Sequence, residues 1–183
     1  MGDPRRLKKK YETPNHPWEK KRIEEEKKLV LAYGLKNKRE LWRAQTLIRK
    51  YRHLARNLVG LPVEERAEKE NTLLSKMESL GLIKEGGSLD DVLSLKAEDL
   101  LERRLQTVVW KKGLALSPKQ ARQLIVHRHI KVKGNITTAP GMIISKELEP
   151  TVDWAKQPLK LTPPQQQVAV EAQDKAIEGE ENA

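Results

Sequence analysis

Residues 103–146 read RRLQTVVWKKGLALSPKQARQLIVHRHIKVKGNITTAPGMIISK, and this stretch decides how the second half of the chain folds. It contains ten Lys or Arg residues and no Asp or Glu, although the chain of 183 residues has 26 acidic residues. Its apolar residues recur first with the period of a helix and then with the period of a strand. The stretch therefore predicts a folded module of two helices and a hairpin whose surface lies against a polyanion.

The first predicted helix of the module spans residues 100–112, and Gly113 ends it. Its leucine and valine side chains share one face of the helix. We therefore expect Arg104, Thr107 and Lys111 on the opposite, exposed face. The second predicted helix begins next, and its start signal is specific.

Ser117 has the form of an N-cap, and Pro118 occupies the first helical position. The apolar side chains of this second helix are expected to point inward, namely Ala121, Leu124 and Ile125. Its exposed face is expected to present Lys119, Arg122 and Gln123.

Residues 129–133 alternate with period two, which predicts a strand with Ile130 and Val132 buried and with Lys131 and Lys133 exposed. Turn residues follow the strand, and two more short strands are expected around a Pro-Gly pair. These segments are the turn at Gly134-Asn135 and the strands at residues 136–138 and 142–144.

Charge is sorted into blocks along the chain. Residues 1–60 have a net charge of +11, residues 61–102 of −6, residues 103–146 of +10 and residues 147–183 of −5. The total of +10 and the pI near 9.7 favour a nucleic-acid partner. An anionic membrane surface is the weaker alternative.

The pattern predicts an α+β fold that is mostly helical: a helical N-terminal part, then a small module of two helices and a short antiparallel β-hairpin or sheet. The expected parts are a basic extended arm (1–21), a helical domain (22–99), the basic module (100–158) and a disordered acidic tail (159–183). The helical domain has predicted helices at residues 23–35 and 62–80 and a helix start at Ser88 with Asp91.

The clearest helix of the N-terminal part begins at Asn37, which forms a capping-box pattern with Glu40. Apolar residues then recur at alternating spacings of three and four residues until Gly60. Basic residues flank both sides of this apolar stripe. They are Arg39, Arg43 and Lys50 on one side and Arg49, Arg52 and Arg56 on the other.

Several classes of function are excluded or disfavoured by composition. The chain has no Cys, which excludes thiolate zinc sites, and no apolar run approaches the roughly 20 residues of a membrane-spanning helix. His127 and His129 lack a third ligand nearby, so no metal or cofactor is expected. We find no catalytic constellation and expect a cytoplasmic protein that is not an enzyme.

The candidate RNA-binding residues carry positive charge or polar tips on the predicted exposed faces. Few aromatic side chains are available to stack on bases; Trp110 is the one in the module, and it is expected to be a half-buried core residue. Recognition of folded RNA by shape is therefore favoured. The candidates are Arg39, Arg43, Lys50, Arg52, Arg103, Arg104, Lys111, Lys112, Lys119, Arg122, Gln123, His127, Arg128, His129, Lys131 and Lys133.

Residues 101–135, LERRLQTVVWKKGLALSPKQARQLIVHRHIKVKGN, resemble the RNA-binding module of the S4 family of small-subunit ribosomal proteins. Residues 33–43 (YGLKNKRELWR) resemble the N-terminal helical segment of its archaeal and eukaryotic forms. The sequence departs from some bacterial forms of the family, which hold zinc with N-terminal cysteines, because it has none. It also has Lys133 where Asn is common in the family, and Gly141 where a Ser follows the proline.

The resemblance implies direct binding of small-subunit ribosomal RNA at a helical junction, early in assembly. It also implies neighbouring small-subunit proteins, S5 among them, a place near the side where mRNA enters, and an influence on decoding accuracy. The module alone also occurs in RNA-modifying enzymes and other RNA-binding proteins. A free-standing RNA-modifying or RNA-repair factor is therefore the alternative hypothesis, ahead of a DNA-binding or membrane-surface protein.

Overall fold

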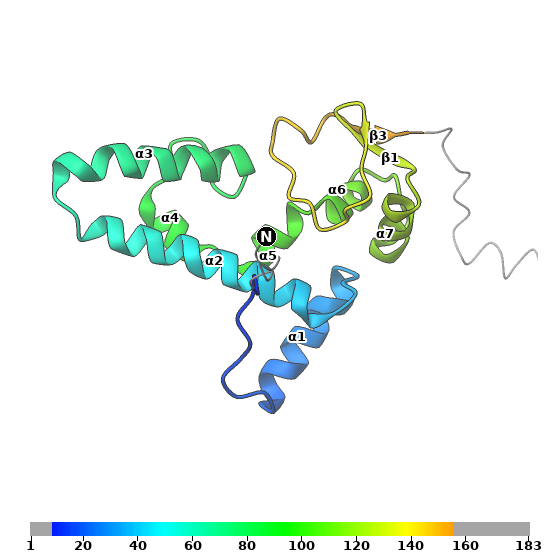
Figure 1. The fold of residues 1–183 in the computed structure, drawn as a ribbon, viewed down its shortest axis with the longest axis horizontal. Helices are drawn as coiled ribbons and strands as arrows, with labels where there is room; N and C mark the ends of the chain where they lie inside the picture. Colours follow the sequence, from blue (N-terminus) through cyan, green and yellow to red (C-terminus); the bar gives the residue numbers. More distant parts are fainter. Residues whose placement is uncertain (1–8, 156–183) are drawn as a thin grey trace, which may run out of the picture.

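The structure is a computed structural model that describes residues 9–155 (Figure 1). Residues 1–8 of the expected arm and the whole expected acidic tail lie outside the described residues. Within residues 9–155 the structure has seven helices and three strands, which agrees with the predicted α+β class. The elements are α1 (Lys20–Ala32), α2 (Lys38–Val59), α3 (Val63–Leu80), α4 (Leu89–Ser94), α5 (Ala97–Glu102), α6 (Leu105–Lys111), α7 (Pro118–Val126), β1 (Ile130–Val132), β2 (Asn135–Ile136) and β3 (Val152–Trp154).

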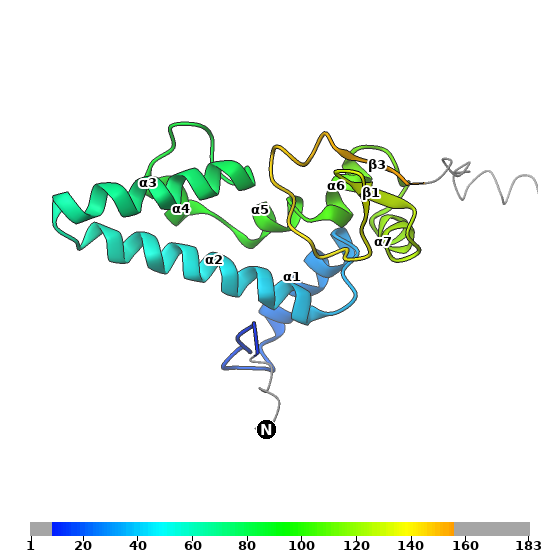
Figure 2. The same cartoon turned by 45° about the horizontal axis from the view of Figure 1, so that its top comes forward.

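The long helix α2 organises the N-terminal part. The Asn37 side chain accepts a hydrogen bond from the Glu40 N–H at 3.2 Å and so starts the helix where the sequence predicts. The predicted apolar stripe is buried, and α1, α3, α4 and α5 pack around α2. In both views α2 and α3 run side by side, while the sheet with α6 and α7 lies at the other end (Figure 1, Figure 2).

Buried side chains form two clusters that follow one another along the chain. The first contains residues between Leu35 and Leu101, and the second contains residues between Leu105 and Val152. Each fully buried Leu or Ile contributes roughly 1.5–3 kcal/mol relative to an exposed one. The segment Arg103-Arg104 therefore connects two separately packed parts.

The helix predicted over residues 100–112 is wrong as a single element, because it breaks into α5 and α6 at Arg103-Arg104. Arg104 has an extended backbone (φ −73°, ψ 143°), and it bridges to Ile143. The N–H groups of Leu105 and Gln106 donate to carbonyls in the loop of residues 139–143. The first N–H groups of α6 thus donate to a loop more than 30 residues later in the chain, where a continuous helix would have them donate to the preceding helical turn.

The start of α7 follows the prediction. The Ser117 hydroxyl accepts a hydrogen bond from the Gln120 N–H at 3.2 Å, and Pro118 takes the first helical position. The inward residues are Ala121, Leu124 and Ile125, and all three are buried. They pack against α6 and the sheet in the second cluster.

The sheet has the order β2-β1-β3, and both pairings are antiparallel. Ile130 and Val132 are buried as predicted, and a two-residue turn of Lys133 and Gly134 joins β1 to β2. The strand predicted at residues 142–144 is wrong. That segment lies along the α5–α6 junction, and the third strand is formed by Val152–Trp154. Its three residues alternate apolar, polar and apolar, but three residues are too few for this alternation to predict a strand.

Two residues of the segment before α1, Tyr11 and Glu12, lie against α2. The Glu12 N–H donates to the Thr46 hydroxyl at 3.0 Å, and the ring of Tyr11 lies 6.0 Å from that of Trp42. This part of the arm is therefore docked on the helix. No helix within residues 9–155 is long and apolar enough to cross a membrane.

The cap of α7 generates the first prediction. Ser117→Ala removes the acceptor for an otherwise unpaired N–H group and should lower the free energy of unfolding by about 1 kcal/mol. Ser75→Ala is the control, because Ser75 is exposed within α3 and its hydroxyl only bonds the Asn71 carbonyl of the same helix. Chemical denaturation measures both; an equal loss in both variants would contradict the cap's role.

Candidate nucleic-acid interface

Helix α2 presents basic side chains along both edges of its buried face. Arg39, Arg43 and Lys50 are exposed and lie within about 40° of one another around the helix axis at 3.6 residues per turn. None of these three forms an ion pair within residues 9–155. We call these residues the α2 edge.

The opposite side of α2 is less available. Arg49 pairs with Glu12 of the docked arm and Arg52 is half-buried, so that only Arg56 is both exposed and without an ion pair among the described residues. Arg52 lines a second cavity together with Glu12 and Glu26, two carboxylates that lower the positive potential there. Of the basic residues predicted on α2, the α2 edge is therefore the better surface for an anion.

The acid-free segment acquires acidic partners when the chain folds. Six of its ten basic side chains pair with carboxylates from outside the segment, at distances of 2.8–3.8 Å. The pairs are Arg103–Glu149, Arg104–Glu40, Lys111–Glu102, Arg122–Glu40, Lys131–Asp153 and Lys146–Glu85. The sequence block thus overstates the number of free cations.

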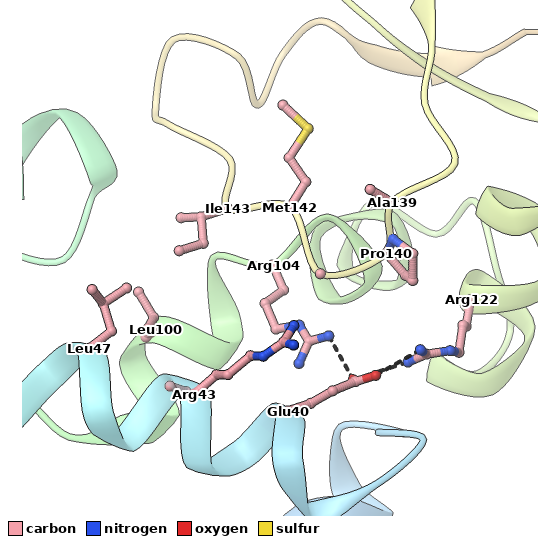
Figure 3. A pocket seen from close by; sticks show the side chains of 12 residues that line it. Glu40, Arg43, Leu47, Leu100, Arg104, Arg122, Ala139, Pro140, Met142 and Ile143 are labelled. Atoms are coloured by element: carbon pink, nitrogen blue, oxygen red, sulfur yellow. Dashed lines mark hydrogen bonds and ion pairs between the residues drawn. The ribbon is translucent and has the colours of Figure 1, made fainter. Parts of the chain in front are cut away.

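Arg104 and Arg122 do not lie on exposed faces, which corrects the sequence prediction for both. Each donates through its Nη2 atom to a Glu40 carboxylate oxygen of α2 at 2.8 Å (Figure 3). The Arg104 side chain is only 8% exposed and that of Arg122 only 22%. We call this arrangement the Glu40 clamp; it joins α2 to both helices of the module.

The Glu40 carboxylate is stabilised as an anion in this clamp. Burial alone would raise its pKa, but the hydrogen bonds and positive charges of Arg122 and Arg104 outweigh burial and hold the pKa of Glu40 below its ordinary value of 4.5. Glu40 therefore remains charged at neutral pH. The sequence signal for its special position is that it is the single acidic residue between Lys38 and Arg56.

Gln106 forms a second connection between the two parts. Its side-chain N–H₂ donates to the carbonyls of Tyr33, Gly34 and Pro118 at 2.9–3.1 Å. Gly34 has φ +58°, and an added Cβ would lie 2.9 Å from the Pro118 Cβ, so glycine permits this close approach. The α1–α2 turn is thereby fixed on the start of α7.

Arg103 and Lys111 lie in a neighbourhood with several carboxylates. Arg103 donates to the Ile144 carbonyl and to Glu149 at 2.8 Å, and Lys111 pairs with Glu102 at 3.1 Å. Thr107, expected on the exposed face, is buried and donates to the Leu101 carbonyl. Of these three residues, only Lys111 is as exposed as predicted.

The remaining predicted residues of the module divide into exposed and partly covered ones. Lys131 is half-buried and lies 3.8 Å from Asp153, and Lys112 is exposed with its amino group donating to the Val152 carbonyl. His129 is half-buried, and the Nδ1 atom has no hydrogen-bond partner among the described residues. The exposed residues whose side chains have neither an acidic partner nor another hydrogen bond among the described residues are Lys119, Gln123, His127, Arg128 and Lys133.

Two of these exposed cations have an unfavourable backbone conformation. Arg128 has φ +64° and Lys133 has φ +51°, and they are the two non-glycine residues with positive φ in the described part of the chain. Arg128 occupies the left-handed position after α7, where hydrogen bonds from Arg128 and His129 to Ile125 and Leu124 form a Schellman motif that usually has Gly. Lys133 occupies a type I′ turn position that favours Asn. A cation at a costly position is typical of a functional residue.

The structure brings the α2 edge and the module together at one cavity of about 570 Å³ (Figure 3). Arg43, Arg104 and Arg122 line it, together with the loop of residues 139–143. Among residues 9–155 no group of three or more His, Cys, Asp or Glu side chains could hold a metal ion. The three arginines make this arrangement suitable for binding an anion.

Comparison with known families divides the chain at the same junction. Residues 4–102 match the family model described as "Ribosomal protein S4/S9 N-terminal domain", and residues 103–149 match the model described as "S4 domain". The first match alone covers more than half of the chain.

Curated relatives match over nearly their whole length. A protein of Ignicoccus hospitalis named "Small ribosomal subunit protein uS4" is 53% identical over 155 residues, which cover 85% of this chain and 93% of the relative. A protein of the same name from Sulfurisphaera tokodaii is 50% identical over 169 residues, covering 91% of this chain and 96% of the relative. The relative from Saccharolobus solfataricus is 54% identical over 155 residues, with 84% and 86% covered.

The clamp generates the second prediction. Glu40→Gln should lower the free energy of unfolding by about 3 kcal/mol, because two largely buried guanidinium groups lose their carboxylate. Glu102→Gln is the matched control: its partner Lys111 is 53% exposed, so the expected loss is about 0–1 kcal/mol. Urea denaturation at neutral pH measures both. Equal losses would show that the clamp contributes no more than a surface pair.

The lowered pKa of Glu40 gives the clamp a pH dependence. Because the folded pKa lies below 4.5, the stabilisation is present above the unfolded pKa and is lost as pH falls through the folded value. The difference in unfolding free energy between wild type and Glu40→Gln should be constant between about pH 5 and 7 and shrink at lower pH. A difference that persists undiminished at about pH 3 would contradict this assignment.

The strained cations generate another prediction. Arg128→Gly should raise the free energy of unfolding by about 1 kcal/mol, because Gly adopts positive φ without a Cβ penalty, and should weaken RNA binding. Arg128→Ala is the control that removes the charge but keeps the strain, so it should weaken binding equally without the gain in stability. Thermal unfolding and filter binding measure these effects; unchanged RNA affinity in both variants would assign Arg128 to structure alone.

Proposed function

This chain belongs to the ribosomal protein S4 family, and we propose that it binds small-subunit ribosomal RNA directly through the exposed cations that folding leaves unpaired. It is a structural component of the small ribosomal subunit and not an enzyme. The alternative of a free-standing RNA-modifying factor is therefore set aside, since residues 4–102 match a ribosomal N-terminal domain.

The observation that carries the proposal is the fixed relation between two sets of free cations. The α2 edge supplies Arg39, Arg43 and Lys50, and the module supplies Lys119 and Arg128. The Glu40 clamp and Gln106 hold both sets on rigid elements. Cations on rigid elements contact phosphates without the entropic cost of ordering a loop.

Recognition of RNA by shape agrees with the side chains available. In the described module, Trp110 is a large exposed aromatic residue, but with 37% exposure much of its ring is covered. Stacking of unpaired bases on aromatic rings therefore contributes little here. Contacts from Lys and Arg to the phosphates of folded RNA supply most of the affinity in this proposal.

We further propose the finer features that the family resemblance implies. The binding site is a helical junction of the RNA, because two basic surfaces at a fixed angle fit more than one RNA helix. Binding occurs early in subunit assembly in the cytoplasm. The protein lies near the side where mRNA enters, beside small-subunit protein S5, and influences decoding accuracy.

The test compares RNA binding by two triple variants over a series of salt concentrations. Replacing the α2 edge by Ala (Arg39→Ala, Arg43→Ala, Lys50→Ala) should weaken binding of transcribed small-subunit ribosomal RNA at least tenfold. The slope of log K against log salt should fall by about one for each phosphate that the variant no longer neutralises. A control replaces three exposed lysines of the acidic middle block, namely Lys69, Lys76 and Lys84, and should change neither quantity.

Two outcomes would refute the proposed function. One is equal affinity for ribosomal RNA and for duplex DNA at the same salt concentration. The other is an equal drop of affinity in the control variant and the α2-edge variant, because the positive charge would then act without a defined surface.

A further inference from the structure

The cavity beside the Glu40 clamp has features that binding of RNA helices by shape does not use. It lies between α2, α5 and the loop of residues 139–143, and its volume of about 570 Å³ falls in the range of small-molecule sites (Figure 3). A contact between a basic surface and a backbone phosphate requires no cavity. The hollow therefore fits something that enters it.

The walls of the cavity are mostly apolar. Leu47 of α2 lies on one side and Ile143 on the other, and Met142 in the same loop is 37% exposed (Figure 3). An apolar wall left open to solvent is typical of a surface that a ligand covers. A flat, weakly polar group such as a nucleobase matches it.

The polar side of the cavity has an excess of positive charge. Arg43, Arg104 and Arg122 line it with one carboxylate, Glu40, which gives three cations to one anion. Glu40 is already occupied by Arg104 and Arg122. The charge of Arg43 is left without an acidic partner among residues 9–155, so the site favours a negatively charged group.

Arg104 carries an unused donor at this site. Its side chain is more than nine-tenths buried, yet the Nε atom has no hydrogen-bond partner within the described residues. A buried donor left unpaired costs about 1–3 kcal/mol, which an incoming acceptor would recover. An added Cβ at Gly141 would lie 3.2 Å from a terminal nitrogen of Arg104, so glycine here leaves room around the guanidinium.

We propose that this cavity takes one unstacked nucleotide of the bound RNA, with its phosphate at Arg43 and Arg104 and its base between Leu47 and Ile143. The proposal rests on the proposed function and adds that one base leaves the RNA stack. Single-stranded loops and bulges supply such bases, and the cost of unstacking is lowest where the base is already unpaired.

The α2 edge favours a nucleic acid over an acidic peptide as the source of the ligand. Arg39 and Lys50 continue the row of Arg43 along the helix on both sides of the cavity. A regular line of cations matches the repeated phosphates of a polynucleotide backbone. The cavity has no aromatic residue in its lining, so base contacts are apolar and weakly selective.

The experiment uses the absence of cysteine in this chain. Met142→Cys introduces a single thiol at the mouth of the cavity, and Ser75→Cys introduces a control thiol on the exposed face of α3. In the full-length protein, bound small-subunit ribosomal RNA should slow alkylation of the first thiol at least tenfold and leave the second unchanged. A photoactivatable label on the Met142→Cys thiol should crosslink mainly to a single unpaired nucleotide.

Each outcome either supports or overturns the proposal. Crosslinks spread over paired nucleotides, or unchanged alkylation when RNA is bound, would overturn the nucleotide site even though RNA binding stands. If an acidic peptide, or free AMP or UMP without RNA, protects the thiol at position 142 from alkylation as well as RNA does, the ligand of the cavity is not a nucleotide of the bound RNA.

The variant Arg43→Ala separates this proposal from the proposed function. It should weaken RNA binding at least tenfold and restore alkylation of the thiol at position 142, whereas Arg39→Ala, one turn away and outside the cavity, should weaken binding but keep the thiol protected. If both variants leave RNA affinity unchanged, the nucleotide site and the proposed function both fail. If both weaken binding but leave the thiol equally protected, only the nucleotide site fails.

Discussion

The pairing of one carboxylate, Glu40, with two guanidinium groups is the interaction on which the arrangement of this protein depends. Glu40 lies near the start of α2. Arg104 directly precedes α6, and Arg122 lies within α7. The two apolar clusters on either side share no fully buried side chain, although Ile143 packs against the first. This polar contact orients the two parts together with Gln106 and with the hydrogen bond from the Lys146 N–H to the Ser79 carbonyl. An apolar contact of similar size would hold them together with less directional specificity.

The clamp serves orientation more than stability. Removing three charges from water costs several kcal/mol for each ion, and the attraction between them recovers much of that cost only with good geometry. Distances of 2.8 Å to both oxygens of Glu40 provide that geometry. The consequence is that the α2 edge and the exposed face of α7 have a fixed spacing before any RNA is present, which reduces the entropy lost on binding.

The sequence predicts local features of this protein better than its long-range ones. Asn37, Ser117 and Pro118 mark helix starts through contacts within three or four residues, and the structure confirms them. The break at Arg103-Arg104 and the strand β3 depend on hydrogen bonds between segments far apart in the chain, which helical or strand periodicity does not contain. The assignment of Arg104 and Arg122 to exposed faces fails for the same reason, because α2 covers a face that the short helices alone would expose.

The charge pattern of the sequence likewise gives an incomplete prediction of the binding surface, because it does not show which charges are paired in the fold. A segment without acidic residues indicates a surface for a polyanion. In the fold, however, its basic side chains pair with carboxylates from outside the segment, among them Glu40, Glu102, Glu149 and Asp153. Under the proposed function, the RNA-binding surface consists of the cations that remain after this internal pairing, together with those on α2. The backbone of Arg128 agrees with this proposal, because a cation occupies a positive φ that Gly would adopt with less strain. Internal pairing and backbone strain thus select a smaller set of candidate binding cations than net charge does.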